Sequence, residues 1–140
     1  MAIAAEAAIR AWVNDPARGL AGNGNPLAHG AFLREQRSPS DGSYAVVARN
    51  PEGVGGVVAE DGAVAVARVQ VQVFAGTEQA AEQAAAALRT GFESLTGCPE
   101  RCGDTGVLVL VADNHNGPFF VAGTSEQFCF QVGADFVLTG

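Results

Sequence analysis

Hydrophobic and polar positions alternate along residues 63–75, where valines at every second position from 69 to 73 are separated by glutamines. A period of two is typical of a strand with one buried face. Gly76 ends this strand. Thr77 and Glu78 then favour a helix start, because a hydroxyl caps free amide groups and a carboxylate faces the positive helix end. Beyond them apolar residues recur every three or four positions, as on one helix face. These residues are Ala80, Ala81, Ala84, Ala85, Leu88, Phe92 and Leu95.

The N-terminal region predicts a helix and then a long loop. An alanine-rich helix is expected over residues 2–13, and it ends before Pro16, whose ring pushes the preceding residue out of helical geometry. Residues 15–30 are rich in glycine and proline and have no apolar period, so they predict a flexible loop in which a binding role is plausible. Residues 22–25 are interpreted as a turn and not a phosphate cradle, since no strand precedes them and no lysine follows.

Two hairpins are predicted in the middle of the chain. Residues 31–37 and 43–49 are the strands of the first, joined by a proline and glycine turn at residues 38–42. Asp61-Gly62 favours the tight turn of the second. Valines fall on even positions before residue 67 and on odd positions after it, so we expect a bulge near Ala67 and Arg68.

The C-terminal third predicts further strands. Residues 96–105 form a loop, residues 107–112 a buried strand, Asn116-Gly117 a turn, and residues 118–122 a returning strand. Residues 127–138 alternate most regularly, which favours a central strand of an antiparallel sheet. The expected fold class is α+β, a mixed and mainly antiparallel sheet with two helices packed on it, in a single domain over residues 1–140.

Composition restricts the function classes. With eight basic residues and a net charge of -7, the chain has no electrostatic surface for wrapping nucleic acid. No apolar run approaches the roughly 20 residues that span a bilayer, and the start of the chain lacks the pattern of an export signal. We therefore expect a soluble protein made in the cytoplasm.

Residue types that ligate zinc occur, but their spacing does not favour a metal site. The pair Cys98 and Cys102 is not followed by a second close pair, and Cys129 lies on the presumed polar face of a strand, with His115 as the fourth candidate. A disulfide between Cys98 and Cys102 stays open as an alternative.

No constellation in the sequence predicts catalysis. A cysteine with His115 as base, or His29 with Asp41, would supply the residue types, but neither pair lies on a nucleophile turn or at a helix start. The expectation is a protein that is not an enzyme, with no catalytic, cofactor-binding or metal-binding residues.

Arg34 and Arg37 are the candidate interface residues. They make up a quarter of the basic residues in an acidic chain, on a strand predicted at a sheet edge. Arginine is favoured where carboxylates are held across a subunit contact, so we expect these two residues to pair with carboxylates of a second copy. The alternative is that they are solvated edge residues.

The order of helix, hairpin, strand, helix and alternating last strand resembles that of the tail terminator, or tail completion, proteins of long-tailed bacteriophages. The first stretch that carries the likeness is similar to terminators of phages that infect actinobacteria. The stretches are residues 30–34, 37–39 and 43–47, then 67–74 and 77–82, then 128–132 and 135–137.

The resemblance implies a structural virion protein without catalytic residues. Members of that family form a hexameric ring on the head-proximal end of the tail tube, stop tube assembly and join the tail to the neck. It also implies tube and neck proteins as partners, DNA that only passes through the ring, no cofactor and no membrane. Assembly would take place in the host cytoplasm. The alternatives are another head-to-tail neck protein, or a small-ligand-binding or enzymatic α+β domain with residues 15–30 or 96–105 as its lid.

Overall fold

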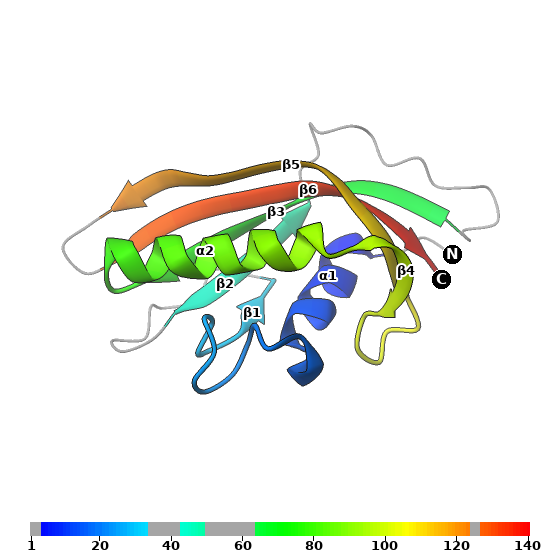
Figure 1. Ribbon diagram of the computed structural model, residues 1–140, viewed down its shortest axis with the longest axis horizontal. Coiled ribbons are helices and arrows are strands. Elements are labelled where there is room, and N and C mark those ends of the chain that lie inside the picture. The colour runs from blue at the N-terminus through cyan, green and yellow to red at the C-terminus, as the bar shows by residue number, and fades with distance from the viewer. Residues whose placement is uncertain (1–3, 34–42, 50–63, 124–126) are drawn as a thin grey trace.

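The structure, a computed structural model, describes residues 4–33, 43–49, 64–123 and 127–140. Within these residues two α-helices and a short 3-10 turn accompany one six-stranded sheet (Figure 1). The elements are α1 (Ala5–Asn14), η1 (Pro16–Arg18), β1 (Ala31–Phe32), β2 (Tyr44–Arg49), β3 (Val64–Ala75), α2 (Glu78–Glu93), β4 (Thr96–Arg101), β5 (Leu108–Gly123) and β6 (Phe128–Thr139). The predicted fold class, α+β with a mixed, mainly antiparallel sheet, is confirmed.

The last strand lies in the middle of the sheet, as its alternation predicted. The strand order is β1-β2-β3-β6-β5-β4, and every neighbouring pair is antiparallel except β1 and β2. β6 pairs with β3 from Val64 opposite Thr139 to Ala75 opposite Phe128, and with β5 on its other side. Strong alternation on β6 therefore reflects two paired edges and one face buried under the helices.

Both helices pack on the same face of the sheet and form a two-layer structure (Figure 1). Trp12 of α1 contacts Phe92 of α2 at 5.7 Å between ring centroids, and Phe92 in turn contacts Phe136 of β6 at 5.0 Å. The predicted helix start at Thr77 is confirmed, since its side chain accepts a hydrogen bond of 3.1 Å from the amide of Ala80. Small alanines then let α2 lie close to the sheet. None of the helices in the described ranges is long and apolar enough to cross a membrane.

The predicted hairpin of residues 31–37 with 43–49 is wrong. β1 has two described residues and runs parallel to β2, with Ala31 opposite Ala45 and Phe32 opposite Val46. A tight turn such as the one predicted at residues 38–42 cannot join parallel strands, because the chain must return to the end from which it started. Much of residues 31–37, with Arg34 and Arg37, lies outside the described residues, and so does the hairpin predicted at Asp61-Gly62.

The bulge predicted near Ala67 and Arg68 is also wrong. β3 pairs with β6 without a register shift, and its odd positions are buried along the whole strand. Ala65 and Ala67 occupy the helix-covered face, whereas Val64 is 39 % exposed on the other face. The prediction took the valines to mark the buried face. Before residue 67, however, the buried odd positions are filled by alanine, and the valines lie on the other face.

Two C-terminal predictions need correction as well. Residues 96–101, predicted as part of a loop, form β4 and pair with the first residues of β5. Asn116-Gly117 is not a hairpin turn. It lies inside β5, and the pairing of β5 with β6 shifts register on both sides of these residues. Gly117 has a φ of 84°, and a Cβ there would lie 2.2 Å from the carbonyl oxygen of Gln131, so only glycine fits this approach of the two strands.

The long segment of residues 15–30 is packed against the rest of the chain. Asp15 caps the 3-10 turn by accepting a hydrogen bond of 3.0 Å from the amide of Ala17. Leu20 and Leu27 are buried in the core, and the amide of Leu27 donates to the carbonyl of Leu20 at 2.9 Å. This segment has no regular period because single leucines anchor it.

Candidate functional site

The outer part of β5 is a free edge of the sheet within the described part of the chain. β4 pairs with β5 only as far as Val111, whereas β6 pairs with β5 up to Gly123. Past Val111, the backbone groups of β5 that point away from β6 face no other described strand. Unpaired N–H and C=O groups in such a row are a template on which another strand can pair.

Three large apolar residues lie near the end of this free edge, and we call Phe119, Phe120 and Val121 the apolar edge. Their exposed fractions are 55 %, 54 % and 45 %. Phe120 is opposite Phe130 on the helix-covered face, with 5.5 Å between the ring centroids, whereas Phe119 is opposite Gln131 and faces the other side. Apolar surface thus emerges on both sides of one strand edge, which is typical of an interaction site.

The irregular middle of β5 is fixed from both faces of the sheet. On the helix side, Nη1 of Arg89 in α2 donates to the carbonyl of Gly117. On the other side, Nδ2 of Asn114 donates to Oδ2 of Asp135 at 2.8 Å, and Asp135 also pairs with Arg68. The position of the apolar edge is therefore set by side chains of α2, β3 and β6 as well as by strand pairing.

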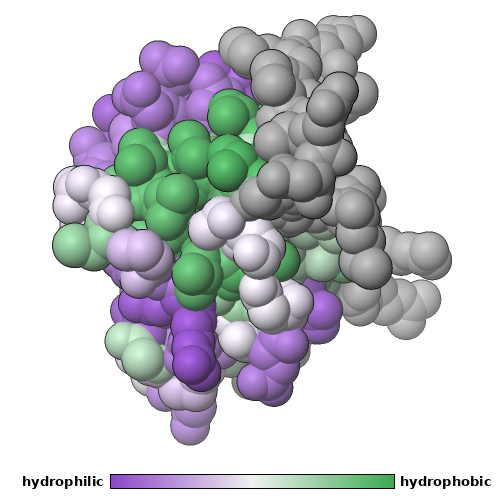
Figure 2. Space-filling view, turned by 90° about the vertical axis from the view of Figure 1, so that its right-hand side faces the viewer, coloured by the Kyte–Doolittle hydropathy of each residue, from purple (hydrophilic) through white to green (hydrophobic). Residues whose placement is uncertain are grey.

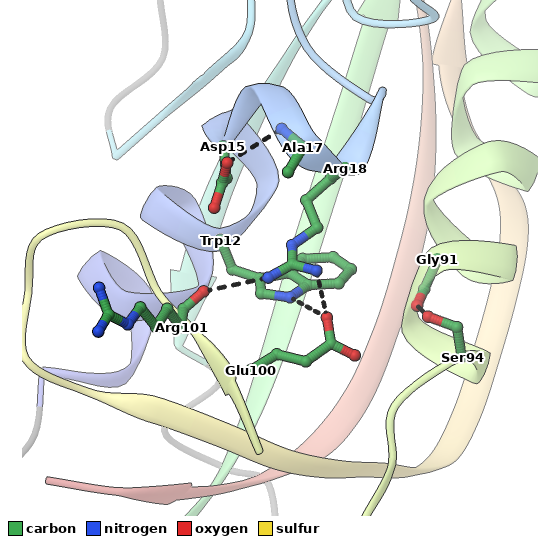
Figure 3. Close-up of polar contacts among 8 residues, drawn as sticks. All are labelled: Trp12, Asp15, Ala17, Arg18, Gly91, Ser94, Glu100 and Arg101. Atoms are coloured by element: carbon green, nitrogen blue, oxygen red, sulfur yellow. Dashed lines mark hydrogen bonds and ion pairs between the residues drawn. The ribbon is translucent and has the colours of Figure 1, made fainter. Parts of the chain in front are cut away.

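A second candidate is the hollow where the two predicted lid segments meet (Figure 3). Arg18 comes from η1 and Glu100 from β4, and Nη1 of Arg18 lies 2.5 Å from Oε1 of Glu100. The same carboxylate oxygen accepts from Nε1 of Trp12 at 3.2 Å, and the Arg18 guanidinium lies 5.2 Å from the centre of the Trp12 ring. The hollow has a volume of about 300 Å³, and its lining residues are Trp12, Ala17, Arg18, Leu20, Gly91, Ser94 and Glu100.

The contacts of Arg18 reduce the capacity of this hollow to bind an anion. Glu100 neutralises the guanidinium, and Nη2 of Arg18 donates to the carbonyl of Arg101 at 3.4 Å. A ligand carboxylate would have to displace Glu100, and that would leave the indole N–H of Trp12 without its acceptor. The ion pair of Arg18 and Glu100 therefore joins the segment of residues 15–30 to β4.

Cys98 and Cys102 are both free thiols. Cys98 is exposed and Cys102 is buried, and no disulfide joins them. Burial raises the pKa of the Cys102 thiol to about 11, although the nearby Arg18 acts in the opposite direction. Cys102 is therefore protonated at neutral pH, and a protonated thiol is a poor nucleophile.

The residues weighed for zinc do not form a metal site within the described part of the chain. Among the described residues, no group of three or more His, Cys, Asp or Glu side chains could hold a metal ion. Asp41, the partner weighed for His29, lies outside the described ranges, and so do the interface candidates Arg34 and Arg37. The interface role of the two arginines stays a prediction.

Comparison of the chain with protein-family models, with curated proteins and with solved structures found no match.

The sequence reasoning missed the apolar edge. Residues 118–122 were predicted to be a strand, but nothing marked them as exposed, because two phenylalanines and a valine are also what a buried strand contains. The neighbouring Asn116-Gly117-Pro118 was a usable signal, since glycine and proline inside a strand are typical of edges and bulges.

Other apolar surface lies at the end of the sheet where β3 begins and β6 ends. Figure 2 shows hydrophobic side chains gathered on this side of the molecule. Val64 is exposed there, and Val66 and Val137, opposite each other on the face away from the helices, are partly buried.

Proposed function

We propose that the chain is a structural subunit of a bacteriophage virion, a tail terminator that forms a ring on the head-proximal end of the tail tube. In this role it stops tube assembly and joins the tail to the neck. The observation that carries the proposal is the apolar edge of β5, because a strand edge with large exposed apolar side chains favours a protein that assembles.

The α+β fold class agrees with the one that the family resemblance implies, whereas the hairpins expected at residues 31–49 and at Asn116-Gly117 are not formed. The resemblance supplies the ring, the tube and neck partners and the virion location, and these parts of the proposal depend on it. The hexamer is the assembly state that we assign.

Charge is consistent with a ring through which DNA passes. A chain with a net charge of -7 repels phosphates, so DNA would slide through the opening without being held. Six such subunits also repel one another. Specific contacts must outweigh this repulsion, and the apolar edge contains no charged residue.

Another head-to-tail neck protein is the nearest alternative, since it would also assemble through an exposed edge. A ligand-binding or enzymatic role would have to use the hollow at Arg18. We rank that role lower, because the Arg18 guanidinium is already paired with the Glu100 carboxylate, and Trp12 donates a hydrogen bond to the same carboxylate.

The test is electron microscopy of purified protein mixed with tail tubes of a long-tailed phage that lack their own terminator. The proposal predicts rings at one end of each tube and no further growth when tube protein is added. Tubes that stay bare and continue to grow would contradict the terminator role. Rings that bind to isolated necks and not to tubes would favour the neck-protein alternative.

A further inference from the structure

We propose that the free edge of β5 pairs with the β1–β2 edge of a second copy of this chain, so that the sheet continues head to tail between subunits. The inference deepens the proposed function, because it names the two surfaces that a ring of identical subunits would join. Its two halves lie at opposite sides of the sheet, as the strand order requires (Figure 1).

The β5 side of the contact is protected by no charged residue at its apolar end, although a proline and register shifts lie along the strand. Proteins guard exposed edges with charges, prolines or bulges. Between Ala112 and Gly123 the only acidic residue is Asp113 and the only basic residue is His115. Pro118 precedes the apolar edge, and one register shift against β6 falls within it, between Phe120 and Ala122. The residues after Pro118 are neutral and suited to accept a strand.

At the opposite edge of the sheet, the two described residues of β1 cover only part of β2. β1 pairs only with Ala45 and Val46, so the next residues of β2 have no described strand on the side away from β3. Ala48 is exposed there. Leu33, directly after β1, is 40 % exposed and supplies an apolar partner for the phenylalanines of β5.

The charges beside the two edges differ in their balance. Arg89 and Glu93 form an i,i+4 pair on α2, and Glu78 and Glu82 precede Arg89 at helical spacings that place them on the same flank. That flank lies beside β5, since Arg89 contacts Gly117. It therefore carries three carboxylates and one guanidinium along the side of β5.

The flank of α1 beside the other edge carries one cation and one carboxylate, because Glu6 precedes Arg10 by four residues. Arg10 of α1 is exposed, and its Nε donates to the carbonyl of Ala31 in β1 at 3.3 Å. A symmetric contact between two β5 edges would bring two acidic flanks together in a chain of net charge -7. The head-to-tail contact instead places an acidic flank near Arg10, and this favours it over the symmetric one.

Unlike a symmetric contact, a head-to-tail contact does not end with two copies. Because each subunit keeps one free edge of each kind, the arrangement closes into a ring or continues as a filament. Such a ring has the same β5 to β1–β2 joint at every subunit boundary.

Thiol cross-linking tests the contact directly. In a Cys98→Ser background, which removes the exposed native thiol, one protein carries Val121→Cys and another carries Ala48→Cys. We expect a short bifunctional maleimide to cross-link the mixture and to leave each protein alone uncross-linked. Cross-linking of the Val121→Cys protein alone would show a symmetric contact, and an assembled mixture without cross-links would show a contact elsewhere. Either result overturns the proposal.

A charge at the edge provides the second test. Val121→Lys should raise the dissociation constant of the assembly by about tenfold or more. The matched control is Val64→Lys, an exposed valine of β3 away from both edges, and we expect it to assemble as the unmodified chain does. Circular dichroism and the melting temperature check that both variants fold. Unchanged assembly of Val121→Lys, or an equal loss in both variants, would overturn the proposal.

These results separate the contact from the function. If Val121→Lys still forms rings that cap tail tubes, the contact is wrong and the terminator role stands. If the mixed cross-link forms but tubes are never capped, the contact is right and the terminator role is wrong.

Discussion

Arg68 and Asp135 are bonded through two contacts across the strand pair at the centre of the sheet. Nε of Arg68 lies 2.9 Å from Oδ1 of Asp135, and Nη2 lies 3.1 Å from Oδ2. The side chain of Asp135 is only 8 % exposed, and Asn114 of β5 donates to the same carboxylate. This carboxylate therefore connects β3, β6 and the irregular part of β5 on the face away from the helices.

Removing the cation should destabilise the fold. Arg68→Ala leaves Asp135 as a buried charge with only Asn114 as side-chain donor, and we expect a loss of about 2 to 3 kcal/mol in free energy of unfolding. The value is below the range of about 3 to 5 kcal/mol for fully buried pairs because the Arg68 side chain is 21 % exposed. Replacing both residues with leucine should cost less than Arg68→Ala. Urea unfolding measures all three, and a single-variant loss below about 0.5 kcal/mol would contradict a structural role for the pair.

Phe130 and Phe119 form a matched pair of substitutions on neighbouring strands. Phe130 is 5 % exposed, and replacement by alanine should cost about 3 to 5 kcal/mol through the cavity that it leaves. Phe119 is 55 % exposed, and its replacement should change the stability of the dissociated subunit by no more than about 0.5 kcal/mol. Chemical unfolding at low protein concentration compares the two. Equal losses would contradict the assignment of Phe119 to an exposed edge.

The thiol of Cys102 should make stability depend on pH. Its pKa in the folded protein is about 11, above the ordinary value of 9.0, so the folded state binds the proton more tightly. Stability from this group is complete below about pH 9 and is lost as the pH rises towards 11. We expect unfolding free energy to fall over this window in the unmodified chain and to fall less in Cys102→Ala. At pH 8 iodoacetamide should label Cys98 quickly and Cys102 only after unfolding.

Arg34 and Arg37 carry a separate prediction that comes from the sequence. Replacing both with glutamate should weaken the ring, because like charges would then face the carboxylates of the next copy. The subunit should stay folded, since exposed substitutions usually change stability by no more than about 0.5 kcal/mol. Sedimentation in low and high salt compares the variant with the unmodified chain. A double variant that assembles and caps tubes normally would show that the two arginines are solvated edge residues.

The sequence predicted the elements whose periods are long and regular. β3, α2 and β6 were located because alternating valines, an alanine stripe and alternating phenylalanines each extend over many residues. β4 was missed because Thr96 to Arg101 shows no alternation and is paired on one side only. The turn preference of Asn116-Gly117 was overridden by pairing with β6 on both sides of it, a long-range effect that local reasoning cannot detect.

The candidate site was less predictable than the fold, for a physical reason. Phe119 and Phe120 look like core residues in the sequence, and they are exposed because β4 ends before it reaches them. Exposure of a strand depends on sheet order, which is a property of the whole chain. Similarly, the ion pair of Arg18 with Glu100 joins residues that are 82 positions apart in the sequence, and only the fold brings them together.

The mass of the particle in solution tests the central claim, which is that identical subunits assemble into a closed ring. Analytical ultracentrifugation over a range of protein concentrations should give a discrete species of six times the subunit mass of 14.3 kDa, with no larger species following it. The Val121→Lys variant should move to the subunit mass under the same conditions. A chain that remains at 14.3 kDa at every concentration, alone and with tail tubes, would contradict the account.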